Sequence, residues 1–183
     1  DANLHRGGHY SELLPVEYEP SPEYLVLFHQ ALERNARVVA RAIATSAERI
    51  LTQRHRPFVL VSLARAGTPV GLLMRRYLLA RHDLNVSHYS ISIIRGRGID
   101  RAAIGWMQSR HRGADLQFVD GWTGKGAIQR ELTAECHALG LDDRLAVAAD
   151  PGFCAAFPGL RDDVLIPSAC LNSTVSGLVS RTV

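Results

Sequence analysis

Residues 115–127 read Asp-Leu-Gln-Phe-Val-Asp-Gly-Trp-Thr-Gly-Lys-Gly-Ala. The stretch 115–119 is mostly apolar, which is typical of a strand buried in a parallel sheet. A glycine-rich turn follows Asp120, and residues 127–139 then repeat apolar side chains on one helical face. The segment therefore predicts a strand, a tight turn and a helix, which together are half of a parallel crossover unit.

The same alternation extends over most of the chain. We expect further strands at 58–64, 88–94, 145–149 and, weakly, 164–166, and helices at 21–54, 70–79 and 102–110. Residues 95–100 are expected to form a mobile basic loop, while 172–183 remain open between helix and strand. The pattern predicts an α/β fold with an open, mostly parallel sheet flanked by helices.

The first helix is expected to be long and to start at a clear signal. Ser21 is a suitable N-cap and Pro22 suits the first helical position. Apolar residues recur at steps of three or four from Leu25 to Ile50, so the whole stripe should face the core. We therefore expect an N-terminal arm at 1–20 and a single domain at 21–183.

Composition limits the class of protein. Hydrophobic residues make up 46% of the chain and the formal net charge is only +3, which favours a globular protein without a nucleic-acid partner. No apolar run approaches the roughly 20 residues that span a bilayer, so we expect no membrane association and a cytoplasmic location. The three cysteines show no CxxC spacing, which argues against a zinc or redox motif.

The glycine-rich turn is a candidate phosphate site. Its three glycines let backbone N–H groups turn toward one anion at the start of a helix, where the helix dipole also favours negative charge. Thr123 adds a hydroxyl, and Lys125 is the only lysine in the chain. The spacing matches neither the Walker loop nor the Rossmann fingerprint. The alternative is a tight turn that binds nothing.

Two carboxylates follow predicted strands at the same edge of the sheet, where ligands of open α/β folds bind. Asp120 is suited to ribose hydroxyls or to Mg²⁺, and its alternative role is to cap the turn. Asp150 is suited to contact an acceptor molecule, and its alternative role is to cap a helix ahead of Pro151. Trp122 either stacks on a base or covers the sheet edge.

Two segments carry a resemblance to known proteins. Residues 61–69 (VSLARAGTP) and 118–126 (FVDGWTGKG) resemble the pyrophosphate loop and the phosphoribosyl pyrophosphate loop of type I phosphoribosyltransferases. With residues 90–95 (SISIIR) and 173–178 (STVSGL), most of the chain resembles a phosphoribosyltransferase-like family of bacterial tellurite-resistance and stress gene clusters. Members of that family have also been labelled cysteine proteases.

The resemblance implies a type I phosphoribosyltransferase-like fold and a phosphoribosyl transfer to or from a base-like acceptor, with a sugar phosphate or nucleotide as ligand, Mg²⁺ as cofactor and a homodimer as possible assembly. Catalytic roles fall on Asp120, Arg95 and Asp150, with Arg97 in the closing loop and Asp120 as the metal ligand. Sugar phosphate would be bound by Asp120, Gly121, Trp122, Thr123, Gly124, Lys125, Gly126 and Ala127. Pyrophosphate would be bound by Ala64, Arg65, Ala66, Gly67 and Thr68, and the acceptor region would contain Asn172, Ser173 and Thr174.

Two other functions stay open. A cysteine protease or hydrolase would use Cys170 near Asn172, with its base among His88, His111, His5 and His9. A noncatalytic nucleotide-binding sensor is the other, because the turn carries one acid where the transferases that it resembles have two adjacent acids. Alkylation of Cys170 or release of pyrophosphate would separate these functions from the transferase.

Overall fold

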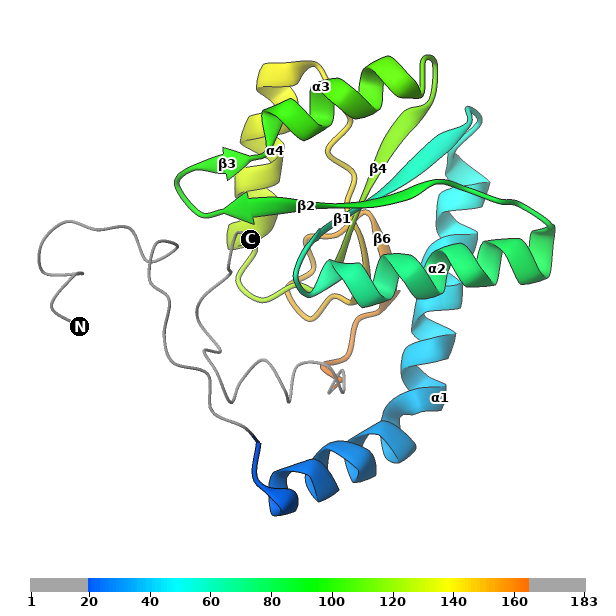
Figure 1. The fold of residues 1–183 in the computed structure, drawn as a ribbon, viewed down its shortest axis with the longest axis vertical. Coiled ribbons are helices and arrows are strands. Elements are labelled where there is room, and N and C mark those ends of the chain that lie inside the picture. The colour runs from blue at the N-terminus through cyan, green and yellow to red at the C-terminus, as the bar shows by residue number, and fades with distance from the viewer. Residues whose placement is uncertain (1–19, 165–183) are drawn as a thin grey trace, which may run out of the picture.

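A computed structural model describes residues 20–164, which form one six-stranded sheet flanked by helices (Figure 1). The strand order is β3-β2-β1-β4-β5-β6, and every pair is parallel except β2 with β3. The strands are β1 (Phe58–Ala64), β2 (His88–Ile94), β3 (Gly98–Ile99), β4 (Asp115–Trp122), β5 (Ala146–Ala149) and β6 (Phe157–Leu160). The expected α/β fold class, with an open and mostly parallel sheet, is confirmed.

Two layers of helices cover the two faces of the sheet. Helices α1 (Pro22–Gln53) and α2 (Gly67–His82) pack on one face, around a core that includes Ile43, Met74 and Phe157. Helices α3 (Arg101–Arg110) and α4 (Ala127–Leu139) share the second core, which includes Met107 and Leu132. The sheet is therefore buried on both sides, which explains its continuous apolar strands.

Helix α1 starts where the sequence predicts, but only its second half is packed. The Ser21 side chain accepts a hydrogen bond from the Tyr24 N–H at 3.3 Å, as expected for an N-cap. The expectation that the whole apolar stripe faces the core is wrong, because Leu25 and Leu32 are 41% and 42% exposed. Burial begins at Val39, where the helix reaches the sheet, and the first half projects beyond it (Figure 1).

The last strand lies earlier than expected. The predicted strand at 164–166 is wrong at Val164, which belongs to no strand, and its other two residues lie outside the described chain. The edge strand is β6 instead, which contains Pro158 and Gly159, two residues that weaken a strand prediction. A Cβ on Gly159 would lie 2.2 Å from the Ala42 carbonyl oxygen, so glycine lets α1 pack directly on this edge.

The expected loop at 95–100 is an anchored hairpin. Its last residues form β3, and the N–H groups of Gly96 and Gly98 each donate to Glu131 of α4 at 3.0 Å. Arg101 adds an ion pair with Glu135, also on α4. The prediction missed these contacts because Glu131 and Glu135 are more than thirty residues away along the chain.

Candidate functional site

The carboxyl edge of the sheet brings together the two loops that the sequence singled out. The segment that joins β1 to α2 packs against the end of β4. It contains the predicted pyrophosphate-binding residues, which run from the last residue of β1 to the start of α2: Ala64, Arg65, Ala66, Gly67 and Thr68. A Cβ on Gly67 would lie 2.3 Å from the Val119 carbonyl oxygen, and one on Gly121 would lie 3.2 Å from the Ala66 side chain. Gly67 is therefore needed for this close approach, and Gly121 makes it tight without a clash.

Asp120 lies in this contact, at the point where the chain order in the sheet reverses between β1 and β4. Its side chain is only 9% exposed, and one carboxyl oxygen accepts the Gly121 N–H at 2.7 Å. Burial raises the pKa of Asp120 to about 7, and the Gly121 hydrogen bond offsets only part of that rise. The carboxyl is thus poised to exchange a proton near neutral pH. Metal and ribose binding by Asp120 stay predictions.

The glycine-rich turn is shorter than expected, because β4 continues through Gly121 to Trp122, which is 42% exposed. Gly126 adopts a φ of +71° and caps α4, which has no side-chain N-cap. Lys125 is exposed, and its carbonyl oxygen accepts a hydrogen bond from Arg130 at 2.9 Å. Phosphate binding by Gly124, Lys125, Gly126 and Ala127 stays a prediction.

The Thr123 hydroxyl, expected to bind phosphate, has partners within the chain, and its role toward a ligand stays a prediction. Thr123 is 5% exposed, its hydroxyl hydrogen is donated to Asp150, and its oxygen accepts the Gly152 N–H at 3.1 Å. The side chain therefore ties the β4–α4 turn to the loop that follows β5. The physical reason is that a hydroxyl has one hydrogen to donate, and the Thr123 hydroxyl donates it to Asp150.

Asp150 is the centre of a buried network. Its fully buried carboxylate accepts hydrogen bonds from Thr123, from the N–H of Cys154 at 3.1 Å and from the N–H of Ala155 at 3.2 Å. Arg161 forms an ion pair with its second oxygen. No helix starts at Pro151, so the helix-capping role is wrong. Contact between Asp150 and an acceptor stays a prediction, although no part of the Asp150 side chain reaches the surface.

Cys154 is a residue that the sequence did not single out as functional. The residue is half-buried, its thiol donates a hydrogen bond to Asp150 Oδ1 at 3.9 Å, and the sulfur lies 3.6 Å from the position that a Cβ on Gly126 would take. The thiol is therefore held beside the first turn of α4. Its neighbour Phe153 is 72% exposed, and the Arg161 guanidinium lies 4.9 Å from the centre of its ring. Nothing in local spacing marks this cysteine, because Gly126 comes from a segment far from it in the sequence.

Cys136 is excluded as a nucleophile. It is fully buried, and burial together with the negative charges of Asp143, Asp142 and Glu135 raises the pKa of its thiol to about 12. A thiol in such surroundings stays protonated and unreactive. Cys170, Asn172, Ser173 and Thr174, together with His5 and His9, lie outside the described residues.

The two predicted bases that the structure describes have other partners. The Ser62 hydroxyl donates to the Gly67 carbonyl oxygen at 2.9 Å, so at the 2.8 Å contact with His88 the imidazole Nε2–H is the donor. Desolvation, helped by Arg75, lowers the pKa of His88 and keeps it neutral. His111 bonds the Tyr89 hydroxyl at 2.9 Å. Neither hydrogen bond involves a cysteine.

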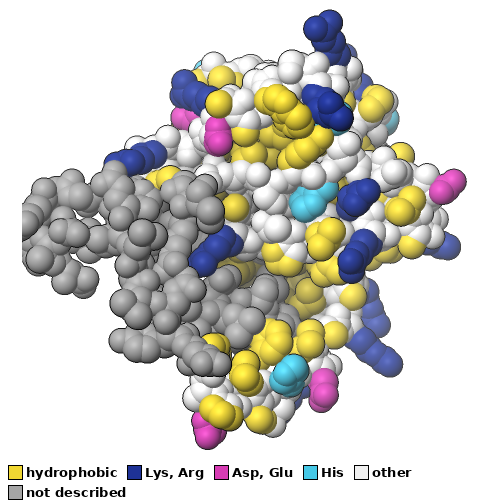
Figure 2. Space-filling model, in the orientation of Figure 1, with side chains coloured by type: hydrophobic (Ala, Val, Ile, Leu, Met, Phe, Trp, Pro, Cys, Tyr) yellow, Lys and Arg dark blue, Asp and Glu magenta, His cyan; other side chains and the backbone are white. Residues whose placement is uncertain are grey.

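The described residues show neither a concentrated basic patch on the face in Figure 2 nor a metal-binding cluster. Arg95 and Arg97 lie in the β2–β3 turn. Within residues 20–164, no group of three or more His, Cys, Asp or Glu side chains could hold a metal ion. On the face in Figure 2, the Lys and Arg side chains that are drawn in colour are dispersed among apolar ones. None of the described helices has the length and apolar character of a bilayer span.

Comparison with a solved structure carries no argument about function. A hypothetical protein from Neisseria gonorrhoeae, solved with bound ppGpp, matches with a TM-score of 0.42 and 15% identity over 61% of this chain and 65% of its own. At that similarity the type I phosphoribosyltransferase-like assignment of the fold has no support beyond the motifs.

Sequence comparison contradicts the predicted phosphoribosyltransferase function. A family model described as tellurite-like stress resistance cysteine protease StiP matches residues 1–183. A protein of Acinetobacter baylyi named cysteine protease StiP is 42% identical over 184 residues, which is 96% of this chain and 46% of the relative. The chain therefore spans about half the length of that relative. Tellurite and stress resistance, expected from the resemblance, agree with the family description.

The expected phosphoribosyltransferase function, and with it the glycosyltransferase class, is wrong, because both matches are named as a cysteine protease. The predicted binding of phosphoribosyl pyrophosphate, nucleotide and magnesium was based on that activity and has no support from these matches. The same holds for the catalytic roles in phosphoribosyl transfer that were predicted for Asp120, Arg95 and Asp150. The alternative that the sequence left open, a cysteine protease, agrees with the names of both matches. By the family model over its whole length and by the identity to the Acinetobacter protein, this chain belongs to the StiP family of tellurite-like stress resistance cysteine proteases.

Proposed function

We propose that this chain carries the nucleophile of a cysteine protease and that the nucleophile is Cys154. The observation that carries the assignment is the position of its sulfur, 3.6 Å from the site of a Cβ on Gly126, at the start of α4. Of the two free cysteines in residues 20–164, it is the one that is not fully buried. The name of the Acinetobacter relative supports the reaction class.

Cys154 lies beside the start of α4, and the thiolate is the reactive form of a cysteine. The first N–H groups of a helix and its dipole stabilise a nearby negative charge. Lys125 precedes the cap residue, and Arg130 Nη1 lies 3.3 Å from the site of a Cβ on Gly126, so two cations flank this helix end. The free N–H groups of the first turn are also suited to an oxyanion.

The reaction follows from this placement. The Cys154 thiolate attacks the carbonyl carbon of a peptide bond, and a carbon–sulfur bond forms while the carbon–nitrogen bond breaks. The departing amine takes up the proton that a base removed from the thiol, and water then hydrolyses the thioester to a carboxylic acid and returns the thiol. Because His88 and His111 are bound elsewhere, the predicted bases that stay in question are His5 and His9.

The test compares the three cysteines in one peptidase assay. We expect Cys154→Ser to lower the rate of peptide hydrolysis by at least about 100-fold, because a serine hydroxyl is a far weaker nucleophile than a thiolate. Cys136→Ala should keep most of the activity, since that thiol is buried away from the edge of the sheet. Cys170→Ser is the competing case. If it abolished hydrolysis while Cys154→Ser left the rate unchanged, Cys154 would not be the nucleophile.

A further inference from the structure

We infer that the ion pair between the buried Asp150 and the partly exposed Arg161 is a positioning device that sets the reactivity of Cys154. The inference builds on the proposed role of Cys154 as the nucleophile. It concerns how the loop between β5 and β6 holds and tunes the thiol, a role that neither the sequence nor the comparisons assign.

One carboxylate fixes the backbone on both sides of the sulfur. Asp150 Oδ1 accepts the Cys154 N–H at 3.1 Å, and Oδ2 accepts the Ala155 N–H at 3.2 Å. The same group takes the Thr123 hydroxyl, which ties the loop to the turn before α4. A further bond, from the Phe153 N–H to the Asp150 carbonyl oxygen at 3.1 Å, closes the turn. The thiol is thereby held against the start of α4.

The charge of this carboxylate conflicts with the thiolate that the reaction needs. The thiol donates a hydrogen bond to Oδ1 at 3.9 Å, and the carboxylate is fully buried, where water screens its charge little. Arg161 removes the conflict, because its guanidinium pairs with Oδ2. From the α4 side, the Arg130 guanidinium is the charged group near the thiol, with Nη1 3.3 Å from the site of a Cβ on Gly126. Arg161 therefore decides whether the loop side of the thiol is neutral or negative.

Arg161 is also accessible to change. Its side chain is 42% exposed, and it lies over the ring of Phe153. A substitution there removes charge without opening the apolar core. The pair Asp150→Asn and Arg161→Met thus changes the charge beside one sulfur in opposite directions, which a purely structural role does not predict.

The experiment measures alkylation of Cys154 by iodoacetamide, a neutral reagent, at pH 7. Modification of the peptide that contains Cys154 is followed by mass spectrometry, so Cys136 and Cys170 do not interfere. We expect Asp150→Asn to react several-fold faster than the unmodified chain and Arg161→Met several-fold slower, because a negative charge beside the sulfur opposes the negatively charged form that reacts. Arg161→Lys keeps the charge and should restore most of the rate.

Three results would overturn the inference. Faster alkylation in both Asp150→Asn and Arg161→Met would mean that the ion pair merely keeps the loop closed. Unchanged rates in both would mean that the charges do not act on the thiol. Equal rates in Arg161→Lys and Arg161→Met would exclude the charge as the cause. Thermal unfolding of each variant shows that the chain is folded. Alkylation does not require peptidase activity, so this result and the test of Cys154→Ser fail independently.

Discussion

Asp120→Asn is expected to raise the free energy of unfolding at pH 8 by up to about 4 kcal/mol and to leave it almost unchanged at pH 4. Burial raises the pKa of Asp120 from 3.8 to about 7 in the folded chain. An ionised carboxylate at pH 8 is therefore held where it is poorly solvated. Asparagine is uncharged and its Oδ1 can still accept the Gly121 N–H. The variant keeps the hydrogen bond and loses the cost of the charge.

The sign follows from proton binding. The folded chain binds the Asp120 proton more tightly than the unfolded chain does, so unfolding releases a proton between about pH 4 and pH 7. Asp120 consequently makes the protein less stable as pH rises through that window, and its effect is constant above it. Asp120→Asn should remove this slope.

Urea denaturation at several pH values between 4 and 8 measures the effect. Asp162→Asn is the matched control, because Asp162 is exposed and surface substitutions usually change stability by less than about 0.5 kcal/mol. Curves of stability against pH that run parallel for Asp120→Asn and the unmodified chain would show that Asp120 is ionised at the same pH folded and unfolded.

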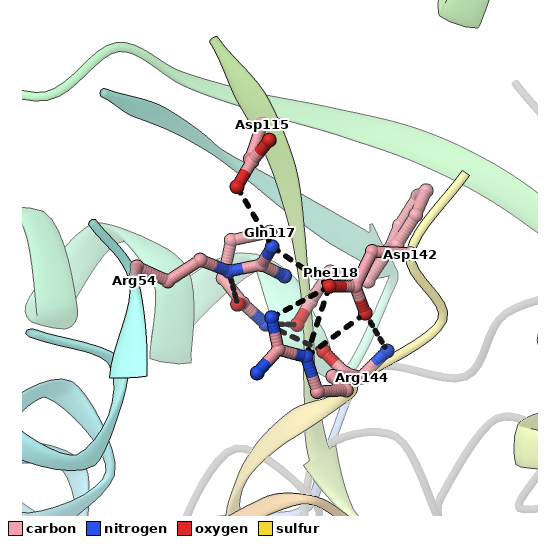
Figure 3. A network of polar contacts seen from close by, with 6 residues as sticks. All are labelled: Arg54, Asp115, Gln117, Phe118, Asp142 and Arg144. Atoms are coloured by element: carbon pink, nitrogen blue, oxygen red, sulfur yellow. Dashed lines mark hydrogen bonds and ion pairs between the residues drawn. The ribbon is translucent and has the colours of Figure 1, made fainter. Parts of the chain in front are cut away.

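Arg54→Met is expected to lower the free energy of unfolding by about 3 kcal/mol. Figure 3 shows the guanidinium between Asp115 and Asp142. Asp115 is the first residue of β4, whereas Cys154 follows the carboxyl end of the parallel strand β5, so the two lie toward opposite ends of the strands. Nη1 lies 3.0 Å from Asp115 and 2.9 Å from Asp142, and the Arg54 side chain is 1% exposed. Its Nε donates to Gln117 at 3.0 Å.

The loss is large because one side chain joins three elements. Arg54 is the C-cap residue of α1, Asp115 is the first residue of β4, and Asp142 lies in the connection from α4 to β5. Methionine fills similar volume but leaves two carboxylates and the Gln117 side chain without this donor. Both carboxylates are about one third exposed, so water recovers part of the cost.

Guanidinium denaturation compares Arg54→Met with Arg101→Met. Arg101 also forms an ion pair, with Glu135, but its side chain is 60% exposed, so its removal should cost less than about 1 kcal/mol. Equal losses in the two variants would contradict the view that burial makes the Arg54 network important. Alkylation of Cys154 should be unchanged in Arg54→Met under conditions where the chain is folded.

Sequence patterns predicted the elements that depend on local periodicity. The helix at 127–139 and the strands at 58–64 and 88–94 have the expected bounds, because each repeats its own apolar pattern over a whole element. The edge strand β6 was missed because its proline and glycine hide that pattern, and they suit an edge next to α1. The motifs at 61–69 and 118–126 lie in loops that meet because they follow neighbouring parallel strands, but the motifs did not predict the reaction class.

By itself, the sequence determined the α/β layers and the meeting of the loops after β1 and β4, because alternating apolar strands and helices have few stable ways to pack. Only the tertiary structure decided which groups are buried and paired there. Asp150 accepts hydrogen bonds from Thr123, 27 residues away, and from Arg161, 11 residues away. Cys154, which is bonded to Asp150, lies beside the start of α4. Burial and charge at a point in space are sums over neighbours from distant segments, which no local spacing records.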